Sequence, residues 1–286
     1  MLRQAGGLMT LIFLGTYAAA QLNAGSKALH VLFGWDYSLG GIIGSVIVLL
    51  YCVSGGIRAS IWTDAAQSVV MIIAMALMAI ISVQQFGDVG SFWHALGQVD
   101  PHYLSLFPPA LNTTGPFTGP LLFIAGWFFA GFGVVGQPHV MVRFMAMEDS
   151  RLMQRTRLYY YGWWIAFYIL VILAGLSARL LLPEVANFDE ELALPTLALQ
   201  LLPEVWVGLI LAGLFAATMS TMDSQILSCS AALTQDLFPK RLSSYRASKW
   251  TTVFITAVAL AISLSPNKSV FQLVLIAWSA LGAALR

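Results

Sequence analysis

Charge is the scarcest property of this sequence. Only 9% of its 286 residues are Asp, Glu, Lys or Arg, whereas 59% are apolar and the mean hydropathy is +0.80. Soluble domains contain about a quarter charged residues, which keep their surfaces in water. The composition therefore excludes an ordinary soluble domain. It also disfavours a nucleic-acid partner, because no basic run exceeds Lys240-Arg241.

Residues for catalysis and metal binding are also few. The two cysteines, Cys52 and Cys229, lie in apolar stretches that favour neither a disulfide nor a metal site, and the four histidines lack ligand spacing. The motifs GK[ST], GxSxG and HExxH are absent, so ATP-driven pumping has no support and an intramembrane enzyme has only His139 as a central candidate. The sequence predicts no enzyme, no transition metal and no cofactor.

Long apolar segments are what the sequence does contain. Crossing a hydrocarbon core of about 30 Å takes about 20 helical residues, and these segments lack the alternation of barrel strands. We expect an all-α, polytopic membrane helix bundle of about eight transmembrane helices, in a single domain over residues 1–286. The expected spans are 7–33, 39–56, 61–84, 119–145, 158–182, 205–235, 249–265 and 270–286.

Cations fall on alternate connections between these spans. Ten of the 14 Lys and Arg residues share one side: Arg3, Arg58, Arg143, Arg151, Arg155, Arg157, Lys240, Arg241, Arg246 and Lys249. Because cations near helix ends are retained in the cytoplasm, we expect a multi-pass plasma (inner) membrane protein with a cytoplasmic N-terminus. The acidic connections 85–118 and 188–203 are long enough for a short helix over the pore, with a solvated loop as the alternative.

The sixth span carries an oxygen-rich face. Ala217, Ser220, Thr221 and Ser224 follow the spacing i, i+3, i+4 and i+7, and Asp223 lies beside them. Hydroxyls, carbonyls and a carboxylate form the oxygen environment that suits a hard alkali cation. The alternative is that the hydroxyls serve helix packing and bond back to their own backbone.

Other polar residues interrupt the first, third and fourth spans. Asp64 either favours the start of its helix or forms a cation path with the Ser220 face. Tyr17 and Gln21 share one helix face at i, i+4. Pro138, after several glycines, weakens the fourth span midway, which would free the carbonyls near residues 134–135, although a simple kink is the alternative.

Four separated stretches carry family patterns. They are GQPHVMVRFMA at 136–146, GG-x-x-A-x-x-WTD-x-x-Q at 55–67, A-x-x-ST-x-x-x-Q-x-L at 217–227 and AWSALGAAL at 277–285. Together they resemble the sodium/solute symporters, and most closely the sodium/proline symporter branch. The resemblance implies part of a five-plus-five inverted-repeat transporter fold, in which this chain matches core helices three to ten.

On this resemblance the first two core helices are missing, and the chain is expected to be an N-terminally truncated fragment. In the family the first core helix supplies the other half of the sodium site and much of the solute pocket. The isolated chain is therefore expected to show no sodium-dependent uptake above background.

The resemblance also implies roles for individual residues. Ala217, Ser220 and Thr221 match the family's conserved sodium site, where the alanine contributes its carbonyl. Asp64, Asp223 and Ser224 match a second sodium site or an exit path in some relatives, with Asp223 in place of a hydroxyl. Tyr17 matches a proline-contacting tyrosine, and Pro138 matches a proline of a partly unwound helix; Gln21 completes this expected solute set.

Two departures concern the solute. Ala130 stands where the proline branch has Trp, and Val134 stands where it has Tyr; Trp127 substitutes only if the alignment slips by three residues. Proline or a related amino acid remains the first expectation, with pantothenate or a monocarboxylate as alternatives.

We therefore expect a sodium-coupled secondary symporter that imports a small organic solute across the plasma membrane by alternating access. Sodium is the coupling ion, and the partners are the solute and the lipid bilayer, with no obligate protein partner evident. A non-transporting membrane scaffold or an inactive fragment is the alternative from another class.

Overall fold

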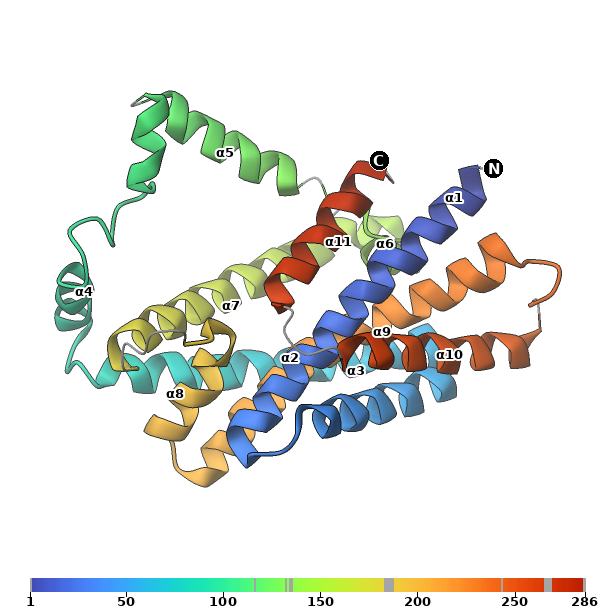
Figure 1. The fold of residues 1–286 in the computed structure, drawn as a ribbon, viewed down its shortest axis with the longest axis horizontal. Helices are drawn as coiled ribbons and strands as arrows, with labels where there is room; N and C mark the ends of the chain where they lie inside the picture. The colour runs from blue at the N-terminus through green and yellow to red at the C-terminus, as the bar shows by residue number, and fades with distance from the viewer. Residues whose placement is uncertain are drawn as a thin grey trace.

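A computed structural model describes residues 2–115, 117–131, 133, 136–182, 188–242, 244–264 and 269–284, and regular secondary structure in these residues is entirely helical. Figure 1 shows an elongated bundle with α4 and α5 at its periphery. The helices are α1 Leu2–Met9, α2 Gly15–Phe33, α3 Tyr37–Gln84, α4 Val89–Gly97, α5 Thr118–Gly131, α6 Pro138–Met145, α7 Met153–Leu181, α8 Ala193–Leu201, α9 Glu204–Ala231, α10 Tyr245–Ser263 and α11 Val270–Ala284.

The first expected span is one long helix. A π-helical turn, Thr10–Leu14, joins α1 to α2 without a break, and the helix ends at Gly34, whose φ of 66° is left-handed. The N–H of Gly34 donates to the carbonyl of His30 at 2.9 Å, which satisfies one terminal carbonyl. Asp36 then caps α3 by accepting from the N–H of Ser38 at 2.8 Å. These two local signals set the turn between α2 and α3.

Helix α3 contains two of the expected spans. Its 48 residues would extend about 72 Å if straight, more than twice the hydrocarbon core. Gly56 breaks it with φ 56° and ψ −143°, a conformation that glycine adopts without steric cost. Figure 1 shows the ribbon turning back there, so segments 39–56 and 61–84 are separate arms.

The fourth expected span is also broken. Helix α5 ends at Gly131 and Pro138 is the first residue of α6, a position where proline's missing N–H costs no helical bond. The break is held closely against α11. A Cβ on Gly136 would lie 2.7 Å from the carbonyl oxygen of Leu281, and one on Gly282 would lie 2.6 Å from the Cα of Gly133. The expected free carbonyls at 134–135 fall outside the described residues.

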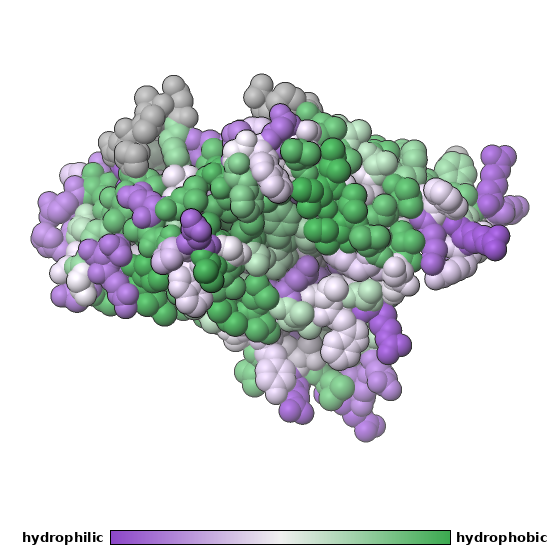
Figure 2. All heavy atoms as spheres, turned by 90° about the horizontal axis from the view of Figure 1, so that it is seen from below, coloured by the Kyte–Doolittle hydropathy of each residue, from purple (hydrophilic) through white to green (hydrophobic). Residues whose placement is uncertain are grey.

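Helix lengths and the apolar outer surface both fit a membrane. Four helical stretches are long and apolar enough to cross a membrane, Leu2–Phe33, Tyr37–Gln84, Ser150–Leu181 and Glu204–Leu237, and Thr118–Phe129 and Val270–Ala283 are shorter apolar helices. Large apolar side chains stay exposed on α7, including Ile165, Ile169 and Ile172. Figure 2 shows an apolar band along the molecule, with polar residues gathered at its two ends and on a protrusion at the bottom of the view. Such a surface needs lipid rather than water.

Small residues bring α3 and α9 together. Gly213 of α9 faces Ala74 of α3, and a Cβ on this glycine would lie 2.7 Å from the Cβ of Ala74. Close backbone approach at small residues drives helix association in membranes. Buried apolar residues of α3, α7, α8 and α9, including Met78, Ala178, Leu197 and Ile210, pack around this crossing. The interface fixes where the second arm of α3 meets α9.

The two acidic connections contain short helices, the first of the two interpretations of these segments. Helix α4 lies within 85–118, and α8 follows a 3₁₀ turn, Glu190–Leu192. Lys27 of α2 pairs with Asp189 and Glu191, both at 2.6 Å. Glu191 also accepts from Ser269 Oγ at 2.7 Å, so it links α2 to the segment before α11.

Burial acts to raise the pKa of the Glu191 carboxyl, but hydrogen bonds from Lys27, Ser269 and the Phe271 N–H outweigh it and hold the pKa at about 2. At the opposite end of α1–α2, Arg3 pairs with Asp236 at 2.8 Å. Each end of this long helix is therefore joined to a different connection by an ion pair.

Candidate cation and solute site

Ala217, Ser220 and Thr221 share one face of α9, as their spacing predicts, and the two hydroxyls bond back to their own helix backbone, as the alternative interpretation expects. Ser220 Oγ donates to the carbonyl of Ala217 at 3.1 Å, and Thr221 Oγ1 donates to the same carbonyl at 3.2 Å. Both hydroxyl oxygens keep lone pairs, so the backbone bonds do not remove them as cation ligands. All three residues are half-buried, which gives a partly dehydrated patch of oxygens within one helical turn.

Asp223 and Ser224 continue this face in a more buried position. The Asp223 side chain has no exposed surface. Ser224 Oγ lies 2.7 Å from Asp223 Oδ1 and 3.0 Å from the carbonyl of Ser220. Asp223 Oδ2 has no hydrogen-bond partner among the described residues. A buried carboxylate oxygen without a donor is costly, and a cation would offset that cost.

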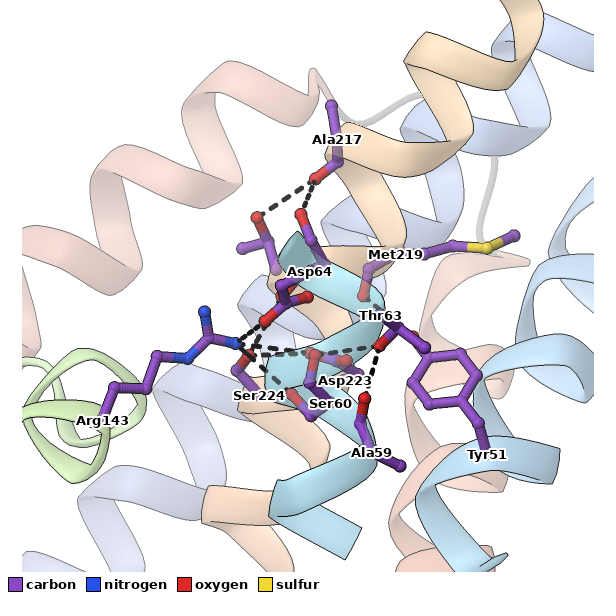
Figure 3. Close-up of polar contacts among 12 residues, drawn as sticks. Tyr51, Ala59, Ser60, Thr63, Asp64, Arg143, Ala217, Met219, Asp223 and Ser224 are labelled. Atoms are coloured by element: carbon purple, nitrogen blue, oxygen red, sulfur yellow. Dashed lines mark hydrogen bonds and ion pairs between the residues drawn. The ribbon is translucent and has the colours of Figure 1, made fainter. Parts of the chain in front are cut away.

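Asp64 reaches the same place from α3. Its side chain is 13% exposed and pairs through Oδ2 with Arg143 of α6, which also lies 3.8 Å from Asp223 Oδ1. Figure 3 shows Arg143 extending from α6 toward Asp64, Asp223 and Ser224. The structure thus brings Asp64 beside Asp223 from distant segments, as the cation-path interpretation of Asp64 requires.

Two groups of α3, the buried Ser60 and the partly buried Tyr51, complete the surroundings. Ser60 Oγ accepts from Arg143 at 3.4 Å, and Tyr51 Oη donates to the carbonyl of Met219 at 3.4 Å. Arg143 itself was considered in the sequence only as a cytoplasmic cation. Its position in the GQPHVMVRFMA motif is a local signal, but nothing local indicates that it points into the bundle.

The candidate solute residues are only partly brought together. Tyr17 is buried, and its ring makes edge contacts with the rings of His139 at 6.0 Å and Trp278 at 6.5 Å. His139 directly follows Pro138, so Tyr17 meets the start of α6. Gln21 lines a small cavity between α2, α3 and α9, together with Gly25, Gly40, Gly44, Thr218 and Met219.

Trp127 lies elsewhere. Its side chain is 60% exposed on α5, and its ring contact is with Phe123 of the same helix at 6.4 Å.

The sequence did not single out Gln137, which is buried with both side-chain amide atoms unpartnered within the described part of the chain. His139 is buried as well, and its Nδ1 has no described partner. Intramembrane polarity is the signal that marks both.

Among solved structures, a Na⁺-coupled sialic acid symporter in a substrate-bound, outward-open state has a similar fold. The TM-score is 0.78 at 21% identity, over 92% of this chain and 58% of that one. This likeness shows that the chain shares the helix-bundle fold of that structure.

Curated relatives are named as transporters. The chain is 29% identical to the osmoregulated proline transporter OpuE of Bacillus subtilis, over 99% of this chain and 58% of that protein. It is also 29% identical to the sodium/proline symporter of Staphylococcus aureus, over 99% of this chain and 56% of that protein. The chain thus spans a little over half the length of these relatives, and they are transporters, in agreement with the expectation that it is not an enzyme.

The sodium:solute symporter family model matches residues 1–286. The match covers the oxygen-rich face of α9, the Asp64 segment and the break before α6 alike. The chain belongs to the sodium:solute symporter family.

Proposed function

We propose that this chain contributes the Ala217, Ser220 and Thr221 half of the sodium site and part of the solute site to a sodium-coupled symporter that imports proline or a related amino acid by alternating access. The observation that carries the proposal is the patch formed by the Ala217 carbonyl and the hydroxyls of Ser220 and Thr221. Its donor set is entirely oxygen, as a hard monovalent cation requires. Asp64, Asp223 and Ser224 form an adjoining second cation pocket or exit path.

The solute would lie near Tyr17 and Pro138, where the broken helix α6 meets α2. Gln21 provides an amide on the same helix as Tyr17, and Trp127 joins this set only if α5 moves toward α2. Sodium bound to α9 would raise solute affinity, and the solute would raise sodium affinity equally, because coupling between two binding sites is reciprocal.

Sodium binding is tested on purified chain by scintillation proximity with ²²Na⁺. The double variant Ser220→Ala/Thr221→Ala, which lacks both hydroxyls, is expected to bind sodium at least about 10-fold more weakly, since one contact to a charged group is worth about 1.5–3 kcal/mol. Ser263→Ala is the matched control, because this hydroxyl also bonds to its own helix, at 2.7 Å from the Leu260 carbonyl, but lies on α10. Unchanged sodium affinity in the double variant would reject the site.

The solute is tested by sodium-dependent binding of labelled proline, pantothenate and lactate. We expect sodium to increase proline binding, and Tyr17→Ala to reduce it. A second candidate solute, pantothenate or a monocarboxylate, is favoured by Ala130 and Val134, which replace two aromatic positions of the proline branch. Sodium-dependent binding of one of these without proline binding would select it. Binding of neither sodium nor any solute would favour a non-transporting scaffold.

We further propose a single transmembrane domain in the plasma (inner) membrane with a cytoplasmic N-terminus. The support is the alternation of cations along the chain, together with the Arg3–Asp236 pair, which places the start of α1 next to the connection that carries Lys240 and Arg241.

A further inference from the structure

The guanidinium of Arg143 enters an oxygen-lined pocket between α3, α6 and α9. Nη2 pairs with Asp64 Oδ2, donates to Ser224 Oγ, lies 3.4 Å from Ser60 Oγ and lies 3.8 Å from Asp223 Oδ1. Figure 3 shows these contacts converging on one end of the side chain. Ser60 is 1% exposed and Ser224 5% exposed, so the inner side of the pocket is closed to water, whereas the Arg143 side chain, 36% exposed, forms its outer side.

We propose that Arg143 is a tethered counter-cation, which fills the second cation pocket with a fixed positive charge in place of a free ion. The inference rests on the proposed function, because it assigns the pocket beside the proposed sodium ligands. A guanidinium keeps its charge at all physiological pH values and offers several donors in a fixed geometry. It therefore provides permanently what a second sodium would provide only transiently.

The formal charges give the consequence. Asp64 and Asp223 contribute two negative charges and Arg143 one positive charge, which leaves one negative charge in the pocket. Asp64 Oδ1 and Asp223 Oδ2 are buried and lack hydrogen-bond partners among the described residues, so the remaining charge is not neutralised by donors of this chain. One monovalent cation on the adjoining Ser220 face balances it. The chain is thus built for one bound sodium and not for two.

Removal of the Arg143 charge tests this count. Sodium binding to purified chain, measured with ²²Na⁺ as a saturation isotherm, is expected to give one site in the wild type and two in Arg143→Gln. The apparent sodium affinity of the variant should rise about 10-fold or more, because the pocket then carries two negative charges in a low-dielectric site. Asp223→Asn alone should weaken sodium binding about 10-fold or more, because it neutralises the pocket.

Charge compensation provides the decisive comparison. The double variant Arg143→Gln/Asp223→Asn restores one net negative charge, so it should return to one site. Arg143→Lys keeps the charge and should also bind one sodium. Arg155→Gln, which removes an equivalent charge from an exposed position on α7, should leave the isotherm unchanged and exclude an effect of net charge.

Each outcome decides the proposal. One site of wild-type affinity in Arg143→Gln, or two sites in the double variant, overturns it. If the wild type binds no sodium, the proposed function fails, but a site gained in Arg143→Gln still supports the tethered cation and its absence rejects it. If Arg143→Gln gives no monodisperse protein, Asp223→Asn decides: weaker binding beside an unchanged Arg143→Lys supports the proposal, and wild-type binding refutes it.

Discussion

Adding one methyl group at Gly213 is expected to separate α3 from α9. The new Cβ would lie 2.7 Å from the Cβ of Ala74, whereas carbon atoms pack at about 3.5–4.0 Å. Neither atom can rotate away, because each is fixed to its backbone, so the helices must move apart by about 1 Å. Overpacking of this kind costs about 1–3 kcal/mol, partly offset by the higher helix propensity of alanine, about 1 kcal/mol.

The assay is the apparent Tm of purified Gly213→Ala by fluorescence-detected size-exclusion chromatography, and a decrease of about 2–8 °C is expected. Gly208→Ala is the matched control on the same helix, because a Cβ there meets nothing within 4 Å. Ala74→Gly should rescue Gly213→Ala by removing the opposing methyl group. The reasoning is refuted if Gly213→Ala is as stable as Gly208→Ala, or if the rescue variant gains no stability.

The same methyl group should also weaken sodium binding. Gly213 lies one turn before Ala217, so a shift of α9 away from α3 moves the proposed ligands relative to Asp64. Gly213→Ala should therefore lower sodium affinity, and the Ala74→Gly rescue should restore it. Wild-type sodium affinity in a destabilised Gly213→Ala would separate this packing contact from the cation site.

Three further predictions concern the ends of the bundle. Because the pKa of Glu191 is depressed from 4.5 to about 2, its ionised form stabilises the fold above pH 4.5 and loses this effect as the pH falls toward 2. Glu191→Gln should therefore lower the apparent Tm at pH 7, and the difference in Tm between this variant and the wild type should become smaller as the pH falls from 4.5 toward 2. Glu190→Gln, the control, should change the Tm little. Asp36→Ala should lower the apparent Tm because the cap of α3 is lost. Asp36→Asn should retain most of the wild-type Tm, since asparagine caps helices about as well as aspartate, and equal decreases in the two variants would contradict the cap assignment. In right-side-out vesicles, an impermeant maleimide should label a cysteine at His102 but not one at Glu148, and the reverse result would invert the proposed orientation.

Local pattern was sufficient for the membrane class and for the helical segments. Hydropathy and segment length are properties of consecutive residues, and the membrane imposes helices because unpaired backbone groups are costly in lipid. The breaks at Gly56 and before Pro138 also have local causes, in a glycine-only conformation and a missing donor. The shared face of Ala217, Ser220 and Thr221 follows from the helical period alone.

The path of the chain after each break was not predictable from local sequence. The sequence predicted a fourth span weakened at Pro138, whereas the structure places that proline at the start of a separate helix, with the break before it held against α11 at Gly136. A proline marks a break, but the neighbouring helix decides where the chain continues. Trp127 shows the same limit, since its place in the sequence does not tell whether α5 packs toward Tyr17.

Residues far apart in the chain decided the rest. Arg143 lies 83 residues from Ser60 and 81 from Ser224, and only the packing of α3, α6 and α9 places their polar groups together. The sequence supported two interpretations of Asp64 equally, an acid that favours the start of its helix and a part of a cation path. It marked Arg143 only as a cytoplasmic cation. Sequence thus determined that this is a helical membrane protein of the symporter family with an oxygen-rich α9, because those properties are local or carried by motifs. Tertiary structure alone decided that two carboxylates share one arginine, because close packing of distant segments fixes which charges are buried together.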